Sequence, residues 1–408
     1  MALSTAPPRL TAWQVVWWFG FVSLAADMVY EGARSMYGPV LAALGASAAV
    51  VGLVTGAGEA MALVLRLVFG PVADRTGRYW TLTIVGYGLT AVCVPLLWFA
   101  PRVGGAGLAV AIVLILLERL GKAVRSPSKS ALLAHAAGAV GRGRGFGVHK
   151  ALDQVGAFAG PLVVAAVVAG ASLWAGMAVL ALPGAVAMGL LAFLCLRVPD
   201  PSVYDPDASR QPHVGDERRG WLRDAVGADL PPVFFRYAFA CALTTGALVT
   251  FGIIGYHLTV DDLVPLAAVP LVYAGAMAVE AVAALVVGAV YDRTGARVLL
   301  VVPVLVAVVP ALALGGTLAF VVVGVVVWGV AQGVQDSTIK AAVADLVPAQ
   351  RRATAYGVFA GIQGALAIVG GAGAGWLYDR SLPALVVAVA VTQVVALALL
   401  ATTLRRTP

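Results

Sequence analysis

Asparagine is absent from this chain of 408 residues, and cysteine and histidine are rare, with three and four copies. Without asparagine there is no acceptor for N-linked glycosylation. Cys93, Cys195 and Cys241 lie inside apolar runs, a position typical of small buried hydrophobic side chains rather than of a disulfide framework or a metal site. The histidines are too dispersed to predict a metal site. We therefore expect no metal and no cofactor.

Charged residues are also scarce. They make up 12% of the chain, against about 25% in soluble domains, while 61% of the residues are hydrophobic. A soluble protein of this size cannot hide so much apolar surface, so we expect the lipid bilayer to be its solvent. The net charge of +7 is scattered over short gaps between apolar runs, which argues against a nucleic-acid partner. The sequence has no phosphate-binding Gly-x-x-x-x-Gly-Lys-Ser/Thr loop and no nucleophile signature, so we expect neither an ATP-driven pump nor an enzyme.

Apolar runs long enough to cross a bilayer recur along the chain. A crossing helix needs about 20 apolar residues, and the runs predict an all-α membrane protein with twelve transmembrane helices in two pseudo-symmetric six-helix bundles. The first six fall near 13–39, 48–70, 80–100, 106–126, 146–169 and 172–196, and the second six near 232–257, 265–288, 298–316, 318–338, 353–377 and 382–403. A polar, proline-rich stretch separates the two sets, which divides the chain into a bundle at 1–197, a linker at 198–230 and a bundle at 231–408.

The lysines and arginines favour one orientation. Gaps on one side of the predicted membrane hold nearly all of them, and the opposite gaps hold only Arg102 and Arg380. Positively charged loops stay in the cytoplasm. We therefore expect a multi-pass protein of the bacterial inner (plasma) membrane, with both termini and the linker in the cytoplasm.

One charged phrase, Gly-x-x-x-Asp-Arg-Thr-Gly, occurs once in each half. Duplicated halves with a site between them are the architecture of secondary transporters. The glycines of the phrase allow close packing and a tight turn, and we expect its first aspartate to accept hydrogen bonds from a neighbouring helix N-terminus and from arginines. The first copy and the residue after it supply Gly70, Asp74, Arg75, Gly77 and Arg78, and the second supplies Gly288, Asp292, Arg293 and Gly295.

With twelve spans, a central linker and this loop in both halves, the chain resembles the major facilitator superfamily over essentially its whole length. The resemblance implies alternating access by two bundles that rock around a central site. It also implies that the charged residues of the two loops latch the outward-open state. Tyr79 stands where the family usually has a further basic residue.

The fifth span carries a second resemblance. Gly147, Gly156, Gly160 and Pro161 have the spacing of a signature found in the family's proton-coupled drug exporters, although two later glycines of that signature are missing. This resemblance implies export in exchange for protons. The alternative is that small residues four apart only allow helices to pack closely.

Several carboxylates fall inside the predicted spans, where each charge costs about 2.5–3.5 kcal/mol on insertion scales. Asp27, Glu31 and Arg34 share one face of the first span, which we expect to point at the central cavity, with Glu31 and Arg34 paired. Glu59 lies deep in the second span and Glu280 in the eighth. Each is a candidate to carry a proton or contact the substrate, and the alternative is that these groups only fix helix packing.

The fourth span carries a basic stripe formed by Arg119, Lys122 and Arg125. Asp153 on the fifth span lies at a similar depth, so we expect it to pair with Arg119 or Lys122. The stripe is interpreted either as a gate on the cytoplasmic side, which we favour, or as a site for an anionic substrate.

These observations predict a monomeric secondary transporter in contact with lipid, whose partners are a small-molecule substrate and protons. The favoured function is proton-coupled export of small amphipathic compounds. Proton-coupled uptake of an anionic metabolite is the alternative. A membrane-embedded enzyme or receptor is a remote one, because the polar residues spread through the membrane depth instead of converging at one surface.

Overall fold

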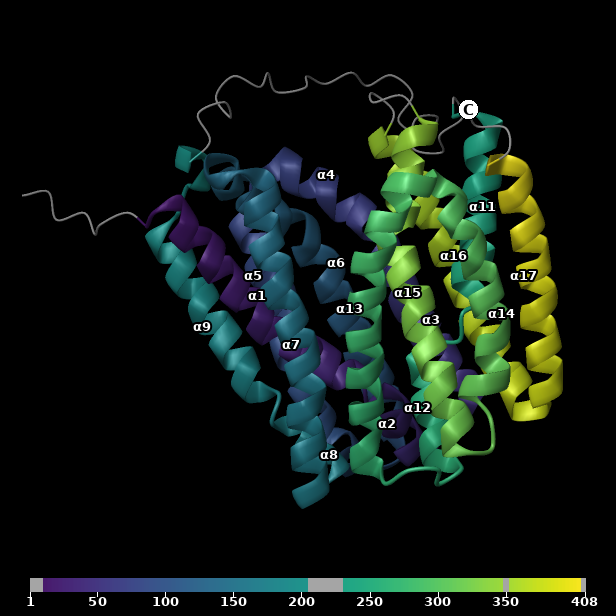
Figure 1. Cartoon of the computed structure of the whole chain (residues 1–408). Coiled ribbons are helices and arrows are strands. Elements are labelled where there is room, and N and C mark those ends of the chain that lie inside the picture. The colour runs from purple at the N-terminus through teal and green to yellow at the C-terminus, as the bar shows by residue number, and fades with distance from the viewer. Residues whose placement is uncertain (1–9, 205–229, 348–351, 405–408) are drawn as a thin grey trace, which may run out of the picture.

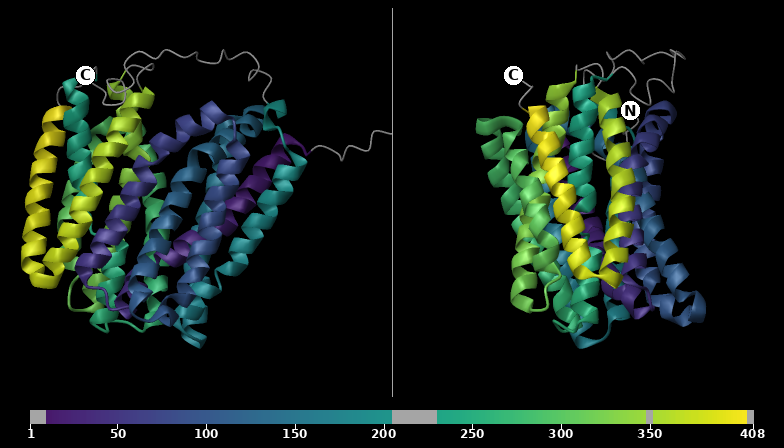
Figure 2. Two further views of the ribbon diagram at one scale, coloured as in Figure 1. Left: turned by 180° about the vertical axis from the view of Figure 1, so that it is seen from behind. Right: turned by 90° about the vertical axis from the view of Figure 1, so that its right-hand side faces the viewer.

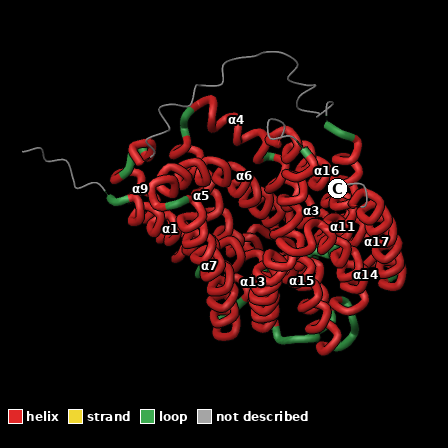
Figure 3. Tube along the Cα trace, turned by 45° about the horizontal axis from the view of Figure 1, so that its top comes forward, coloured by secondary structure: helices red, strands yellow, loops and turns green. Residues whose placement is uncertain are grey.

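A computed structural model describes residues 10–204, 230–347 and 352–404, and all structural statements below refer to these residues. They form helices and short connections, without a strand in the described ranges (Figure 3). The chain leaves the first half at Tyr204 and returns at Leu230 on the same side of the bundle, which we call the linker side (Figure 1). The opposite side is called the far side.

The described helices account for the predicted crossings. Eleven helical stretches among the described residues are long and apolar enough to cross a membrane. The 62-residue stretch Tyr79–Val140 holds two of the crossings, because Gly104 interrupts it with φ 62° and the two helices on either side pack against each other. A single helix of that length would be about three times as long as the hydrocarbon core is thick. Twelve crossings and an all-α membrane fold are therefore confirmed.

The helices of the first half, which are α1 to α9, have these bounds: α1 Ala12–Arg34, α2 Tyr37–Ala43, α3 Ala48–Val64, α4 Arg66–Thr76, α5 Tyr79–Leu96, α6 Gly107–Val140, α7 Arg142–Gly170, α8 Leu173–Ala178 and α9 Ala181–Arg197. Those of the second half are α11 Pro232–Ala247, α12 Phe251–Val260, α13 Val269–Thr294, α14 Val301–Ala313, α15 Leu318–Leu346, α16 Arg352–Arg380 and α17 Leu382–Leu404. Short 3-10 segments join some of them. Most of the predicted linker lies outside the described residues.

The fourth span is longer than predicted. Helix α6 continues to Val140 instead of ending near residue 126, so Pro127 and Lys129 lie within it, and Gly141 alone connects it to α7. The extension is stabilised by an apolar face: Leu132, Leu133 and Ala136 pack against side chains of α1 and α9. This burial outweighs the helix-breaking tendency of the proline.

The first and seventh spans, predicted as continuous over 13–39 and 232–257, are broken. Helix α1 ends at Arg34 and α2 begins at Tyr37, and the backbone between α11 and α12 is extended at Leu248 and Thr250. The carbonyl of Val249 accepts a hydrogen bond of 2.8 Å from the Trp328 indole instead of a helical N–H. Irregular backbone at membrane depth is tolerated where protein surrounds it or where it lines a cavity. The two breaks therefore lie in the interior of the helix bundle, away from its lipid-facing surface.

The two halves meet along α3 and α16, which lie side by side (Figures 1 and 2). Gly52 and Gly56 of α3 face Gly371 and Gly375 of α16, and we call these four residues the glycine seam. A Cβ atom on Gly52 would lie 2.1 Å from the carbonyl oxygen of Gly371, and one on Gly371 would lie 2.4 Å from that of Gly52. The halves therefore touch through backbone atoms, as in the close helix pairs of other membrane proteins.

A carboxylate joins the halves on the far side. Asp379, near the end of α16, accepts hydrogen bonds from the backbone N–H groups of Ala48 at 3.0 Å and Ala49 at 2.9 Å, in the first turn of α3. A helix N-terminus carries partial positive charge and unpaired N–H groups, so a carboxylate there is favourable. We call this contact the far-side clasp. It must break whenever the far side opens.

Asp379→Asn is expected to loosen the far-side clasp by about 1 kcal/mol, or roughly fivefold in the open-to-closed ratio, because the amide loses the charge and one acceptor atom. Spin labels at Gly105→Cys and Gly316→Cys, two exposed far-side positions in different halves, would report a longer mean distance. Asp262→Asn is the matched control, since Asp262 is an exposed far-side acid outside the clasp. An unchanged distance distribution in Asp379→Asn would show that the clasp does not hold the halves.

Candidate functional site

A cavity of about 170 Å³ lies between the two halves, next to the break in the seventh span. The first half contributes a basic and an acidic side chain to its wall, and the second half contributes amides, a carboxylate and aromatic rings. Its far-side end is closed by a hydrogen bond of 2.8 Å between the hydroxyls of Thr55 and Thr250. The charged, amide and aromatic side chains of its lining are Arg34, Glu59, Trp328, Gln332, Gln335, Asp336, Phe359 and Gln363.

An ion pair forms the first half's side of the cavity. Arg34 Nη2 donates to Glu59 Oε1 at 2.8 Å, and Arg34 also lies 3.7 Å from Glu31, the i,i+3 pair that the sequence predicts. Tyr273 of the second half donates a hydrogen bond to Glu31. The Arg34 and Glu59 side chains are partly exposed and line the cavity, so a group in the cavity can contact this pair.

A second ion pair lies behind the first and is fully enclosed. Glu118 is 0% exposed and Arg119 is 3% exposed, and Arg119 Nε lies 3.2 Å from Glu118 Oε2. The Tyr37 hydroxyl donates to the same oxygen at 3.1 Å. Arg119 also lies 3.6 Å from Glu59 and donates to the hydroxyl of Tyr30. The paired charges and hydrogen bonds offset part of the cost of burying these groups, while Glu118 Oε1 has no hydrogen-bond partner among the described residues.

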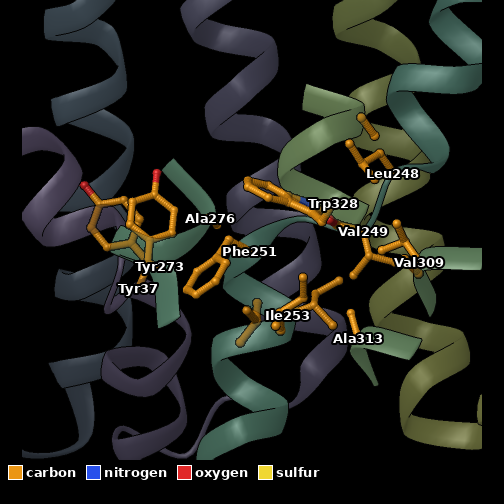
Figure 4. Close-up of a cluster of buried hydrophobic side chains, with 14 of the residues drawn as sticks. Tyr37, Leu248, Val249, Phe251, Ile253, Tyr273, Ala276, Val309, Ala313 and Trp328 are labelled. Carbon is orange, nitrogen blue, oxygen red and sulfur yellow. The ribbon is translucent and has the colours of Figure 1, made fainter. Parts of the chain in front are cut away.

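Three aromatic rings pack together beside the break in the seventh span, and one of them, Trp328, lines the cavity (Figure 4). Phe251, the first residue of α12, lies between Tyr273 and Trp328, with ring centroids 4.5 Å and 6.0 Å away. All three rings are buried. The hydrogen bond from Trp328 to Val249 therefore fixes both the break in the seventh span and the ring that faces the cavity.

A separate polar cluster lies inside the first half, nearer the linker side. Asp27 lies 3.7 Å from Arg125, which donates to Thr90 Oγ1 at 2.7 Å. The Ser23 hydroxyl connects the rest of the cluster: it accepts from Lys129 at 3.2 Å and lies 2.8 Å from His149 Nε2. We call this group, completed by Tyr87 and Asp153, the Asp27 cluster.

The structure separates residues that the sequence grouped together. Asp153 does not pair with Arg119 or Lys122 as predicted; its neighbour is His149, 4.0 Å away one turn earlier on α7. The expectation was wrong because similar depth does not fix the direction in which a helix face points. The Nζ atom of Lys122 lies 3.5 Å from the centre of the Tyr30 ring.

The basic stripe does not line the cavity. Arg119 and Arg125 are buried in their own contacts, and among the described residues of the cavity wall the basic side chain is that of Arg34. Of the predicted first-span face, Arg34 alone reaches the cavity, while Asp27 points into its own cluster. Glu280 on α13 is half-buried and is not among the residues that line the cavity.

The repeated loop forms the turn that its glycines predict. Gly77 and Gly295 have φ values of 63° and 62°, where a side chain would be strained. The sequence predicts that Asp74 accepts hydrogen bonds from arginines and from a neighbouring helix. In the structure its carboxylate instead accepts a hydrogen bond from the Tyr79 hydroxyl at 3.0 Å. The polar tyrosine thus occupies the place that a basic residue has in the family pattern. The charged side chains Arg75, Arg78 and Arg293 are exposed, Gly70 and Gly288 have no tight neighbour, and the side chain of Asp292 lies outside the described set.

The fifth-span motif has a packing function. Cβ atoms on Gly156 and Gly160 would lie 2.2 Å and 2.3 Å from carbonyl oxygens of α1, so both glycines allow α7 to contact α1 closely. Gly147 faces open space, and Pro161 lies within the continuous helix α7. The close-packing interpretation therefore explains two of the four motif residues directly.

Several site residues were not among the predicted ones. Tyr37, Glu118 and Tyr273 join the ion pairs, and Gln335 and Asp336 line the cavity. The signal for α15 is present in the sequence: polar or aromatic side chains at 328, 332, 335 and 336 follow helical spacing on one face. The tyrosines give no such signal, because an isolated tyrosine in an apolar run is usually an ordinary packing residue.

Residues 19–263 and 233–408 match the Major Facilitator Superfamily. An uncharacterised protein of Mycobacterium tuberculosis is 49% identical over 397 residues, which cover 96% of this chain and 93% of that protein. An uncharacterised transporter of the same superfamily type from Methanocaldococcus jannaschii is 26% identical over 145 residues, 36% of this chain and 35% of that protein.

Solved transporter structures share the fold. The nucleoside transporter NupG has a TM-score of 0.71 at 14% identity, covering 96% of this chain and 99% of NupG. A bacterial homologue of the human lysosomal transporter Spinster, in an inward-facing and occupied conformation, has a TM-score of 0.67 at 16% identity and covers 96% of both chains. A POT family transporter in complex with 5-aminolevulinic acid has a TM-score of 0.72 at 13% identity, again with 96% of both chains covered. At these identities the likeness concerns the fold alone.

Proposed function

This chain belongs to the major facilitator superfamily, and we propose that it exports small amphipathic compounds from the cytoplasm in exchange for protons. The linker side would then face the cytoplasm, as the distribution of lysine and arginine favours. The cavity would hold the compound between the halves. The far-side clasp and the glycine seam would part when the cavity opens outward.

The wall of the cavity supports an amphipathic substrate. One part of it is polar, with Arg34, Glu59, Gln335 and Asp336, and another part is apolar, with Trp328 and with aliphatic and aromatic side chains such as Leu248, Ile339 and Phe359. An engineered cavity of about 150 Å³ holds benzene, so a cavity of about 170 Å³ suits a single ring with a short polar group. A polar solute without an apolar part would leave the apolar side chains of the wall without an apolar group to contact.

The observation that carries proton coupling is the contact between Asp27 and Arg125. The 3.7 Å separation means that a proton on Asp27 removes an attraction that Arg125 otherwise feels. The Asp27 cluster shares helices α1 and α6 with the two ion pairs near the cavity. A change in the distance between these helices therefore reaches Arg34 on α1, and it reaches Glu59 on α3 through the hydrogen bond between the two side chains.

Uptake of an anionic metabolite is the weaker proposal. It relied on the basic stripe of α6, whose residues Arg119 and Arg125 are enclosed and engaged with acids and hydroxyls. The described cavity wall carries the acids Glu59 and Asp336 against the single base Arg34, a formal charge that disfavours an anion.

Purified protein in liposomes with a pH-sensitive dye inside tests the proposed function. External addition of lipophilic cations to acid-loaded vesicles is expected to release internal protons, and Asp27→Asn is expected to reduce the rate at least tenfold. Asp262→Asn is the matched control, because Asp262 is an exposed carboxylate outside the Asp27 cluster and outside the repeated loops. Release that persists unchanged in Asp27→Asn would remove Asp27 from coupling. A response to organic anions instead of cations would replace export by anion uptake.

A further inference from the structure

We propose that the second half binds the protonated amine of the substrate through α15, and that the site requires an ammonium group that still carries N–H hydrogens. This inference rests on the proposed function, since it names the polar group of the amphipathic compound. It concerns Gln335 and Asp336. Neither residue belongs to the repeated loops or to the ion pairs of the first half.

Helix α15 presents one continuous face to the cavity. Trp328, Gln332, Gln335, Asp336 and Ile339 all line it. Their spacing of four, three, one and three residues keeps them on one side of a helix. Amide and carboxylate groups therefore lie beside an indole ring on a single rigid element, directly opposite the ion pair formed by the first half.

Gln335 has an acceptor atom without a partner. Its side chain is 5% exposed, and its Nε2 group donates to the Ala331 carbonyl at 3.2 Å, while Oε1 has no hydrogen-bond partner among the described residues. A buried unsatisfied acceptor costs about 1–3 kcal/mol. Gln335 lines the cavity but its Oε1 atom is closed off in this arrangement, so a rotation of the side chain is needed to turn Oε1 toward a ligand N–H, and the bond then removes this cost.

Asp336 supplies the negative charge next to that acceptor. It is exposed on the cavity side, and no described basic side chain lies within ion-pair distance of it. By contrast, Glu59 across the cavity is already paired with Arg34 at 2.8 Å. An entering cation is therefore attracted to α15 rather than to the first half.

The remaining surroundings match the apolar part of an amine. Trp328 and Phe359 line the cavity, and an aromatic face attracts an ammonium group by about 0.5–2 kcal/mol depending on hydration. Both primary and quaternary ammonium ions satisfy the charge and the rings. Only an ion with N–H groups also satisfies Gln335, so this residue distinguishes the two.

Binding is tested by isothermal titration calorimetry with 2-phenylethylamine, its N,N,N-trimethyl derivative and 3-phenylpropionate. The primary amine is expected to bind at least tenfold more tightly than the trimethyl ion, and the carboxylate not to bind. Gln335→Leu is expected to abolish the difference between the two cations. Asp336→Asn is expected to weaken both cations at least tenfold while the wild-type order between them is kept.

Gln393→Leu is the matched control. Gln393 is buried on α17, and its Oε1 atom also has no partner among the described residues, but it lies outside the cavity lining. This variant is expected to bind all three compounds as the wild type does. Equal affinity for the two cations in the wild type, or tighter binding of the carboxylate, would overturn the proposal. Because calorimetry needs no proton gradient, such a result would leave proton exchange in liposomes as a separate finding, and failure of proton exchange would leave amine binding intact.

Discussion

Arg119→Met is expected to lower the free energy of unfolding by about 3–5 kcal/mol, the usual cost of removing one partner of a buried ion pair. The reason is that Glu118, which is 0% exposed, would keep its charge without a cation beside it. The hydroxyl of Tyr37 would remain as a hydrogen-bond donor but supplies no charge. The thermal midpoint of the detergent-solubilised protein, followed by intrinsic fluorescence, measures the effect.

The double variant Glu118→Gln with Arg119→Met is the control for that result. It removes both charges, and replacing a buried pair by neutral groups of similar size is often close to neutral for stability. We therefore expect it to recover most of the lost stability. Arg119→Lys is expected to recover little, because a lysine cannot reach Glu118, Glu59 and Tyr30 together as the planar guanidinium does. Equal midpoints for the single and double variants would contradict the energetic importance of the pair.

Gly371→Leu is expected to shift the far-side-closed arrangement toward open by about 1–3 kcal/mol, or about 5- to 150-fold, the range for overpacking a tight contact. The added Cβ atom alone would lie 2.4 Å from the carbonyl oxygen of Gly52, and backbone cannot move aside as a side chain can. The same pair of spin labels at Gly105 and Gly316 would report the change, and substrate exchange in liposomes would slow at least tenfold.

Gly373→Leu is the matched control for the seam, since Gly373 lies two residues away on the same helix and a Cβ atom there would meet nothing within 4 Å. It is expected to leave both the label distance and transport within twofold of the wild type. If the two glycine variants behave alike, the close backbone contact in the seam is not what holds the halves together.

The fold could be predicted from the sequence because its signal is long-range hydropathy. Runs of about 20 apolar residues and a repeated charged loop specify twelve crossings, whatever the details of packing. The break in the seventh span could not be predicted in this way. Leu248, Val249 and Thr250 are ordinary membrane residues, and the extended backbone is stabilised by a hydrogen bond from Trp328, 79 residues later.

The candidate site was predictable only where partners lie close in sequence. Glu31 and Arg34 are one helical turn apart, so their contact follows from spacing. The contact between Arg34 and Glu59 depends on how α1 and α3 are rotated against each other, and the mistaken partner of Asp153 has the same origin. Gln335 could not be recognised as a binding residue, since an unpaired acceptor is a property of its surroundings and not of its type.

The glycine seam also has a consequence for the evolution of the chain. Gly52, Gly56, Gly371 and Gly375 already have the smallest side chain possible, so every mutation at these positions adds atoms to a contact that has no space for them. Two positions further along α16, Gly373 has open space around it and can accept larger residues at little cost. Substitutions in α16 are therefore expected to accumulate on the helix faces turned away from the other half, and not on the face that forms the glycine seam.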